Sequence, residues 1–135
     1  MLFRSSVSYR MISDVPFGTF LSGGVDSTIV TAFAQKNSSI PINTFSIAFE
    51  EEQFNEIEYA RKVAKHLGTN HHEMICSYSS AFELFDDIFS VYDEPIIDTS
   101  MFPTMIVSKF ARQHVTMALS GDGGDETFFG YGNYT

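Results

Sequence analysis

Residues 21–27 read Leu-Ser-Gly-Gly-Val-Asp-Ser, a run that combines two hydroxyl groups, two glycines and one carboxylate. The run follows an apolar stretch, residues 17–21, and leads into a segment with helical spacing that begins at Asp26 or Ser27. A strand that turns through two glycines into a helix collects free backbone N–H groups and the positive end of the helix dipole at one point. The run therefore predicts a binding site for the phosphates of a nucleotide.

The carboxylate of Asp26 adds a second requirement to this site. A carboxylate beside phosphates repels them unless a divalent cation lies between the two, and Mg²⁺ takes oxygen ligands of both kinds. No lysine follows the two glycines, so the run is not a P-loop of the Walker type. We therefore expect a nucleotide that is bound together with Mg²⁺.

A second run, residues 120–126, reads Ser-Gly-Asp-Gly-Gly-Asp-Glu and carries three carboxylates among three glycines. By itself, such a run is compatible with a solvated acidic turn. If it lies beside the first run, its carboxylates and Asp26 crowd the phosphates, and that arrangement is stable only with cations. We therefore expect carboxylates of this second run to be ligands of the same Mg²⁺.

The other polar candidates fit structural roles better than chemical ones. His71 and His72 are neighbours, so on a strand their side chains point to opposite faces and do not easily bind one metal ion. His66 and His114 are likewise expected to be structural or surface residues, and Cys76 is expected to be a buried thiol. Asp93, Glu94 and Asp98 either line the crevice or belong to an exposed loop.

The elements that position both runs alternate between strand and helix. This order predicts a doubly wound α/β domain, with a parallel sheet and helices on both faces. In such sheets a ligand binds outside the carboxyl ends of the strands, where the strand order reverses. With the order 3-2-1-4, the two runs follow the strands on either side of that reversal and face each other across one crevice. The expected strands are 17–21, 42–49, 71–76 and 115–119, and the expected helices are 2–11, 27–36, 55–67, 80–91 and 103–112.

The composition limits the class of protein. With 135 residues, 44% of them hydrophobic, the chain is expected to form one domain with a full core. Eight Lys and Arg against 17 Asp and Glu give a net charge of −9, which argues against a nucleic-acid partner. No apolar run approaches the length of a membrane span, and Met1 to Arg10 does not form a signal peptide. With a single cysteine as well, these features predict a cytoplasmic protein without a membrane partner.

The two runs together resemble a known family. Residues 21–27 are similar to the pyrophosphate-loop signature of the N-type ATP pyrophosphatases, whose fold is of the adenine nucleotide alpha hydrolase type. The stretches 13–16, 92–95 and 118–126, with Gly130 and Tyr131 after them, resemble the synthetase domain of glutamine-hydrolysing asparagine synthetases. The resemblance runs from about Met11 to Tyr131.

The resemblance implies a reaction and a role for each matching position. ATP adenylates the side-chain carboxylate of aspartate and releases pyrophosphate, and ammonia then attacks the β-aspartyl-AMP to give asparagine and AMP. Asp122 matches an acidic position that is important for forming or consuming the acyl-adenylate. The other implied roles are pyrophosphate binding for Ser22, Gly23, Gly24, Asp26 and Ser27, adenosine binding for Leu21, Ile47, Ser120 and Gly121, and Mg²⁺ binding for Asp26 and Asp125.

The chain also departs from the family's complete enzyme. Residue 2 is Leu2, and the single cysteine is Cys76, so the N-terminal nucleophile of a glutaminase domain is missing. The sequence stops at Thr135, before the family's helical region with its basic residues, and Phe129 replaces a usual glycine. We therefore expect residues 1–135 to be one synthetase domain truncated at both ends, with a glutaminase domain or a C-terminal half supplied in trans.

Two alternatives remain open at this point. One is another carboxylate-activating enzyme of the same superfamily, similar to a β-lactam synthetase. The other is a catalytically incomplete fragment that binds nucleotide and associates with another chain through the aromatic end formed by Phe128, Phe129, Tyr131 and Tyr134.

Overall fold

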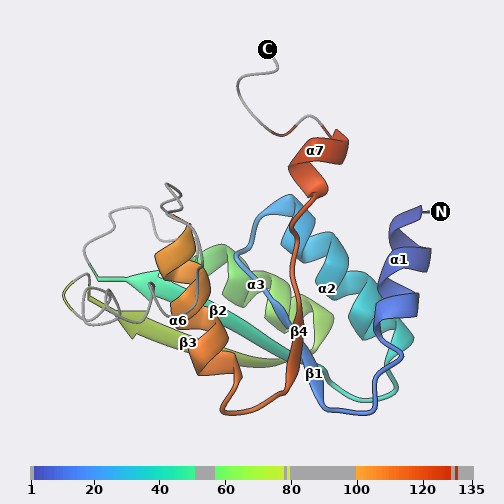
Figure 1. Cartoon of the computed structure of the whole chain (residues 1–135), viewed down its shortest axis with the longest axis horizontal. Coiled ribbons are helices and arrows are strands. Elements are labelled where there is room, and N and C mark those ends of the chain that lie inside the picture. The colour runs from blue at the N-terminus through green and yellow to red at the C-terminus, as the bar shows by residue number, and fades with distance from the viewer. Residues whose placement is uncertain (1, 51–56, 78, 80–99, 129, 131–135) are drawn as a thin grey trace, which may run out of the picture.

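The computed structural model describes residues 2–50, 57–77, 79, 100–128 and 130. Its centre is a parallel four-stranded sheet in the order β3-β2-β1-β4, as predicted from the sequence (Figure 1). The order reverses between β1 and β4, so the segments that follow these two strands leave the sheet side by side. The strands are β1 Phe17–Phe20, β2 Asn43–Phe49, β3 Asn70–Cys76 and β4 Met117–Leu119.

Helices cover both faces of this sheet. Helices α2 and α3 lie on one face, with α1 packed against α2, and α6 lies on the other (Figure 1). The alternation of side chains along each strand explains the division, since Thr19 bonds to Thr31 of α2 whereas Phe20 packs toward α6. The helices are α1 Leu2–Arg10, α2 Val25–Asn37, α3 Ile57–Leu67, α6 Met101–Ala111 and α7 Gly124–Phe128.

Two apolar clusters hold the layers together. Between the sheet and α2, the buried side chains of Val30, Ala34 and Leu119 form one cluster. Across the sheet, Phe45 is completely buried against Val107 of α6 and its neighbours. Burying apolar surface on both faces stabilises the sheet at about 25 cal/mol per Å² and fixes the ends of the strands in space.

Most element boundaries differ from the sequence predictions by one residue, and the starts of β4, α2 and α6 differ by up to two. Strand β4 begins at Met117 because the N–H of Val115 still donates to Ala111 O (2.9 Å), as in the end of a helix. Helix α2 begins at Val25, one residue before Asp26 and two before Ser27, the two expected starts. Helix α6 begins at Met101 rather than at Pro103, which still lies in its first turn. The second glycine-rich run contains the short helix α7 rather than only loop. The predicted helix over residues 80–91, and Asp93, Glu94 and Asp98, lie outside the described residues.

Helix α3 ends as its sequence predicts. Gly68 follows it with a φ of 70°, a left-handed conformation that favours glycine. The N–H of Thr69 then donates to Ala64 O (3.1 Å), which satisfies a carbonyl of the last turn. None of the helices in the described part of the chain is long and apolar enough to cross a membrane.

Candidate functional site

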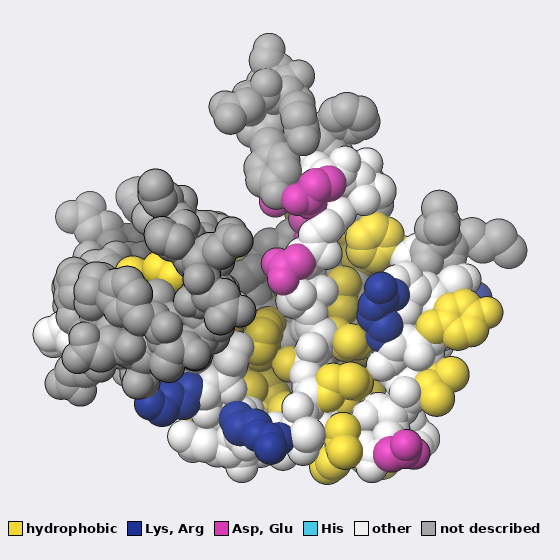
Figure 2. Space-filling model, viewed as in Figure 1, with side chains coloured by type: hydrophobic (Ala, Val, Ile, Leu, Met, Phe, Trp, Pro, Cys, Tyr) yellow, Lys and Arg dark blue, Asp and Glu magenta, His cyan; other side chains and the backbone are white. Residues whose placement is uncertain are grey.

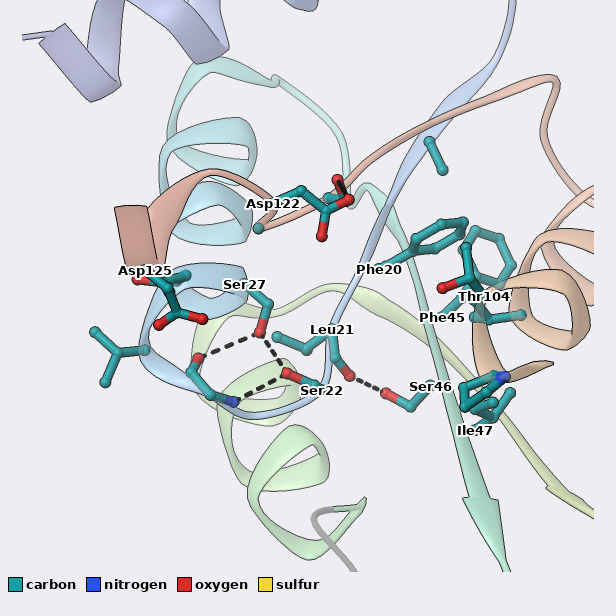
Figure 3. Close-up of a pocket in the computed structure, with 18 of the residues that line it drawn as sticks. Phe20, Leu21, Ser22, Ser27, Phe45, Ser46, Ile47, Thr104, Asp122 and Asp125 are labelled. Atoms are coloured by element: carbon teal, nitrogen blue, oxygen red, sulfur yellow. Dashed lines mark hydrogen bonds between the residues drawn. The ribbon is translucent and has the colours of Figure 1, made fainter. Parts of the chain in front are cut away.

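A cavity of about 730 Å³ opens at the carboxyl ends of β1, β2 and β4 (Figure 3). Its walls come from the segment after β1 with the first turn of α2, from the middle of β2, from α6, and from the segment between β4 and α7. The cavity thus lies at the reversal of strand order, where the topology predicts a ligand site. The lining residues with a proposed role from the sequence are Leu21, Ser22, Gly24, Asp26, Ser27, Ile47, Ser120, Gly121, Asp122 and Asp125.

One end of the cavity is formed by the start of α2. The hydroxyl of Ser22 accepts a hydrogen bond from Gly24 N–H (3.2 Å) and lies 3.0 Å from the hydroxyl of Ser27. Ser27 in turn donates to Gly24 O (3.2 Å), so the hydroxyls brace the turn from within. The amides of the first turn of a helix have no carbonyl partner inside it, and together with the helix dipole they favour an anion at this point.

Gly23 is not among the residues that line the cavity. It has a φ of 91°, and a Cβ at this position would lie 2.7 Å from both Ala60 N and Tyr59 Cβ of α3. Glycine is therefore required here because the loop packs directly on a helix backbone. Its contribution to the site is the shape of the turn that presents Ser22 and Gly24.

The second glycine-rich run touches the first. A Cβ at Gly121 would lie 2.8 Å from Ser27 N, and a Cβ at Gly124 would overlap the carboxylate of Asp26. The missing side chains let the segment after β4 lie directly on the start of α2, as expected from the strand order. Within the segment, Ser120 donates a hydrogen bond to Asp122 Oδ2 (2.8 Å), which orients that carboxylate.

The carboxylates of Asp26 and Asp125 meet where the two segments join. Burial raises the pKa of Asp26. The negative charge of Asp125 raises it further, as does a hydrogen bond that the protonated Asp26 carboxyl group donates to Asp125. Glu126 adds a smaller effect in the same direction on the pKa of Asp26. The two carboxylates are close enough for one to favour protonation of the other. At that separation they can also share a cation.

This donor set fits Mg²⁺ bound with a ligand, but not a site closed by protein alone. Among the residues that the structure describes, no group of three or more His, Cys, Asp or Glu is placed to hold a metal ion. Mg²⁺ commonly uses one or two carboxylates and completes its octahedron with phosphate oxygens and water. Asp26 and Asp125 therefore suit an ion that arrives with a phosphate chain.

The opposite end of the cavity is apolar. Phe20, Phe45 and Ile47 come from the strands, and Pro103 and Val107 come from α6. Such a wall suits the flat surface of an aromatic ring, which gains from contact with apolar and aromatic side chains. The cavity thus joins an anion-binding end to an apolar end.

The contribution of α6 and of Ser46 was missed by reasoning from the sequence. Pro103, Thr104 and Val107 line the cavity because α6 crosses the face of the sheet at the carboxyl end of β2. Ser46 lines it too, and it is 4% exposed. The sequence offered one indication of a role for Ser46, because this polar residue stands among apolar residues in the middle of a central strand.

The histidines and the cysteine have structural surroundings. His71 lies on the α3 face, with Nδ1 2.8 Å from the hydroxyl of Thr44, and burial lowers its pKa. His72 lies on the opposite face, where its ring stacks on Phe45. Cys76 is half-buried rather than buried as expected, and its Sγ donates to Ala48 O (3.4 Å). The predicted opposite orientation of the two histidines is thus found in the structure.

Acidic and basic side chains lie in different places on the visible face. Acidic side chains gather over the segment that ends in α7, whereas Lys and Arg lie over α6 and α1 (Figure 2). Within the described residues, no Lys or Arg lines the cavity. Among the described lining residues, backbone amides are therefore the groups that can favour an anion.

Comparison with known proteins gives a consistent result for family and fold. The protein family described as Asparagine synthase matches residues 1–135. The chain is 44% identical over 131 residues to a putative glutamine-hydrolyzing asparagine synthetase 2 from Methanocaldococcus jannaschii, covering 96% of this chain and 25% of that protein. It is 40% identical over 129 residues to the glutamine-hydrolyzing asparagine synthetase 1 of Bacillus subtilis, covering 96% and 20%. The chain therefore spans a quarter or less of these relatives.

Two solved structures share the fold. An NMN synthetase from Francisella tularensis superposes with a TM-score of 0.64 at 19% identity, covering 96% of this chain and 57% of that chain. An NH3-dependent NAD synthetase from Campylobacter jejuni superposes with a TM-score of 0.59 at 13% identity, covering 97% and 58%. At these identities the likeness concerns the α/β architecture.

Proposed function

Because this chain belongs to the asparagine synthase family, we propose that its cavity binds ATP with Mg²⁺ and forms the ATP-binding core of an asparagine synthetase. The observation that carries this proposal is the contact between the two Ser-Gly segments. Gly121 lies against the backbone of Ser27, and Asp26 meets Asp125 at the same place. An anion-binding helix end and a pair of carboxylates are thus parts of one site.

We assign the phosphate chain to the end of the cavity formed by α2. Ser22, Gly24 and Ser27 border the free amides of its first turn, which stabilise negative charge without a basic side chain. The adenosine then extends from Gly121, beside the start of α2, to the apolar end, where Leu21 and Ile47 contact it; all three contact it largely through backbone atoms. Ser120 borders the same end and also orients Asp122.

Asp26 and Asp125 would hold Mg²⁺, which neutralises phosphate charge and orients the chain when bound. In the proposed reaction, a carboxylate oxygen of aspartate attacks the α-phosphorus of ATP, and the bond to the pyrophosphate oxygen breaks. The leaving pyrophosphate gains negative charge, and amides fixed around it stabilise that charge more in the transition state than in the ground state. Ammonia then attacks the acyl carbon, and AMP leaves.

We assign Asp122 to the acyl-adenylate step. Its carboxylate is exposed, lines the cavity and is held by Ser120 at 2.8 Å. This position allows it to act on the ammonia or on the adenylate rather than on the base. Because the chain spans only part of its relatives, the ammonia supply and the aspartate pocket are proposed to depend on a glutaminase domain or on a further C-terminal part.

Calorimetry with ATP, with and without Mg²⁺, tests the nucleotide half of the proposal. We expect markedly tighter binding with Mg²⁺, and binding that is indifferent to the metal would reject the assignment. Release of AMP and pyrophosphate in the presence of aspartate and ammonia tests the chemical half. A panel of other carboxylates separates an asparagine synthetase from a lactam-forming relative.

A second candidate is nucleotide binding without turnover. The absence of Lys and Arg from the described lining of the cavity favours it, because no basic side chain there stabilises the transferring phosphoryl group. The two candidates differ when a separate C-terminal half of a relative is added. Turnover restored by that addition supports the complete reaction, whereas binding that stays unproductive supports the second candidate.

A further inference from the structure

Ser46 occupies an unusual position in the hydrogen bonding between β1 and β2. The N–H of Leu21 donates to Phe45 O (2.9 Å), which continues the parallel ladder one bond beyond the last residue of β1. In a regular parallel ladder, the next bond would run from Ile47 N–H to Leu21 O. The pairing ends at Phe20 and Phe45 instead, and among the described residues no backbone bond joins Ile47 to Leu21.

The carbonyl of Leu21 has a different donor. Ser46 Oγ donates to it, and both side chains are buried, with 1% of Leu21 and 4% of Ser46 exposed (Figure 3). A buried carbonyl needs a hydrogen-bond partner, so the serine hydroxyl takes over a bond that the backbone would otherwise make. The amide of Ile47 is thereby left without its ladder partner.

The released amide lies in the wall of the cavity. Leu21, Ser46 and Ile47 all line it, at the apolar end where Phe45 and Val107 also contribute. A backbone N–H in a mostly apolar wall is a strong directional donor, and burying it without a partner costs about 1–3 kcal/mol. A ligand with an acceptor atom in the plane of an aromatic ring would satisfy it.

We propose that Ser46 is a positioning residue, which holds the carbonyl of Leu21 so that Ile47 N–H stays free to recognise the base of a nucleotide. This inference rests on the proposed function for the class of ligand. It adds a residue that does not itself contact the base, and it explains why a polar side chain stands in the carboxyl half of a central strand.

The proposal predicts a rearrangement in Ser46→Ala. Without the hydroxyl, Leu21 O accepts from Ile47 N–H, and the ladder gains one pair. In the ligand-free protein, hydrogen exchange of the Ile47 amide, followed by NMR, should slow about tenfold, which corresponds to one backbone hydrogen bond. Ser46→Thr retains a hydroxyl and should restore the faster exchange.

Ligand binding gives an independent readout. With Mg²⁺ present, Ser46→Ala should weaken ATP and AMP binding by about tenfold, the loss expected for one hydrogen bond to the base. Binding of inorganic tripolyphosphate should be unchanged, because it uses only the α2 end. Thr31→Val is the matched control, since it removes a buried hydroxyl that bonds to Thr19 away from the cavity. It should lower stability without slowing exchange at Ile47.

The outcomes separate this inference from the proposed function. If the wild-type chain binds Mg²⁺-ATP but Ser46→Ala leaves both Ile47 exchange and ATP affinity unchanged, only the role of Ser46 is rejected. If Ser46→Ala lost affinity for ATP and for tripolyphosphate equally, the effect would be structural, and the role of Ser46 would also be rejected. If the wild-type chain binds no ATP, the proposed function and the assigned ligand are both rejected. Hydrogen exchange at Ile47 in Ser46→Ala then still tests whether Ser46 keeps the Ile47 amide free.

Discussion

Gly121 lies so close to the start of α2 that a Cβ on it would come within 2.8 Å of Ser27 N. The contact joins two segments from distant parts of the sequence and brings the acidic run against the anion-binding helix end. Backbone approach of this kind depends on glycine, because any other side chain forces the segments apart. The site therefore depends on the packing of two loops as much as on the residues that face the ligand.

The first prediction concerns this contact. Gly121→Ala should displace the segment after β4 and weaken Mg²⁺-ATP binding at least tenfold, together with a stability loss of about 1–3 kcal/mol from overpacking. Gly68→Ala is the matched control, because Gly68 has a φ of 70° but nothing within 4 Å of its missing Cβ. Gly68→Ala should lose stability through backbone strain but bind Mg²⁺-ATP as tightly as the wild type does. Calorimetry and thermal unfolding measure both effects, and similar affinities of the two variants would contradict the prediction.

Much of this arrangement could be predicted from the sequence because it depends on local patterns and topology. The alternation of strands and helices indicated a parallel, doubly wound sheet, for which the order 3-2-1-4 was expected. The structure has this order, which places the segments after β1 and β4 together. Gly68 correctly indicated the end of α3. These features are encoded by a few residues next to each other in the chain.

The remaining features depend on contacts that no local pattern encodes. The approach of α6 to the cavity, which brings in Thr104 and Val107, results from packing across the sheet. The bond from Ser46 to Leu21 requires knowing which ladder bond is missing. Gly23 fits the pyrophosphate-loop signature, but in the structure its backbone packs on α3. The signature alone does not tell whether a glycine is needed for contact with a ligand or with another helix.

The second prediction concerns Asp26. Burial and the neighbouring Asp125 raise its pKa in the folded protein, so the folded state binds a proton more tightly than the unfolded state does. Stability from this group is therefore fully present below the ordinary pKa of aspartate. It is lost as the pH rises from that value through the raised pKa of the folded state. Asp26→Asn should make the ligand-free protein more stable at neutral pH and remove the dependence of ATP binding on Mg²⁺. Asp14→Asn, an exposed change outside the cavity, should do neither.

Thermal unfolding without nucleotide, and calorimetry with and without Mg²⁺, measure the two effects of Asp26→Asn. If Asp26→Asn unfolds at a higher temperature and its ATP binding no longer depends on Mg²⁺, the carboxylate of Asp26 serves ligand binding rather than stability. A variant that is less stable and still binds ATP in a metal-dependent way would show that Asp26 has a structural role instead.

The third prediction concerns stability in mild acid. Burial lowers the pKa of His71 and of His72 in the folded protein, whereas in the unfolded chain histidine titrates near pH 6.5. The unfolded state therefore binds more protons below that pH, and the free energy of unfolding should fall as the pH drops from about 7 to 5. In His71→Gln the fall should be smaller. The variant is compared with the wild type and with the same change at the exposed His66.

A further loss of stability is expected at lower pH. Hydrogen bonds from Arg61 lower the pKa of Glu73, so its contribution is present at neutral pH and is lost as the pH falls below the ordinary range for glutamate. Urea unfolding at a series of pH values separates this step from the histidine step. Equal profiles for His71→Gln and the wild type between pH 7 and 5 would contradict the histidine assignment.

The last prediction divides the cavity into its two ends. Thr104 is exposed on α6 and lines the apolar end, so Thr104→Trp should fill the space assigned to the base without disturbing the core. ATP affinity should fall at least tenfold, and tripolyphosphate affinity should stay within about twofold, because the amides of α2 are untouched. Ser108→Trp places the same bulk one turn along the helix, on an exposed residue outside the cavity, and should bind both ligands normally. If Thr104→Trp weakened both ligands equally, or neither, the base would have to lie elsewhere, and the apolar wall of Phe20, Phe45 and Val107 would be core rather than site.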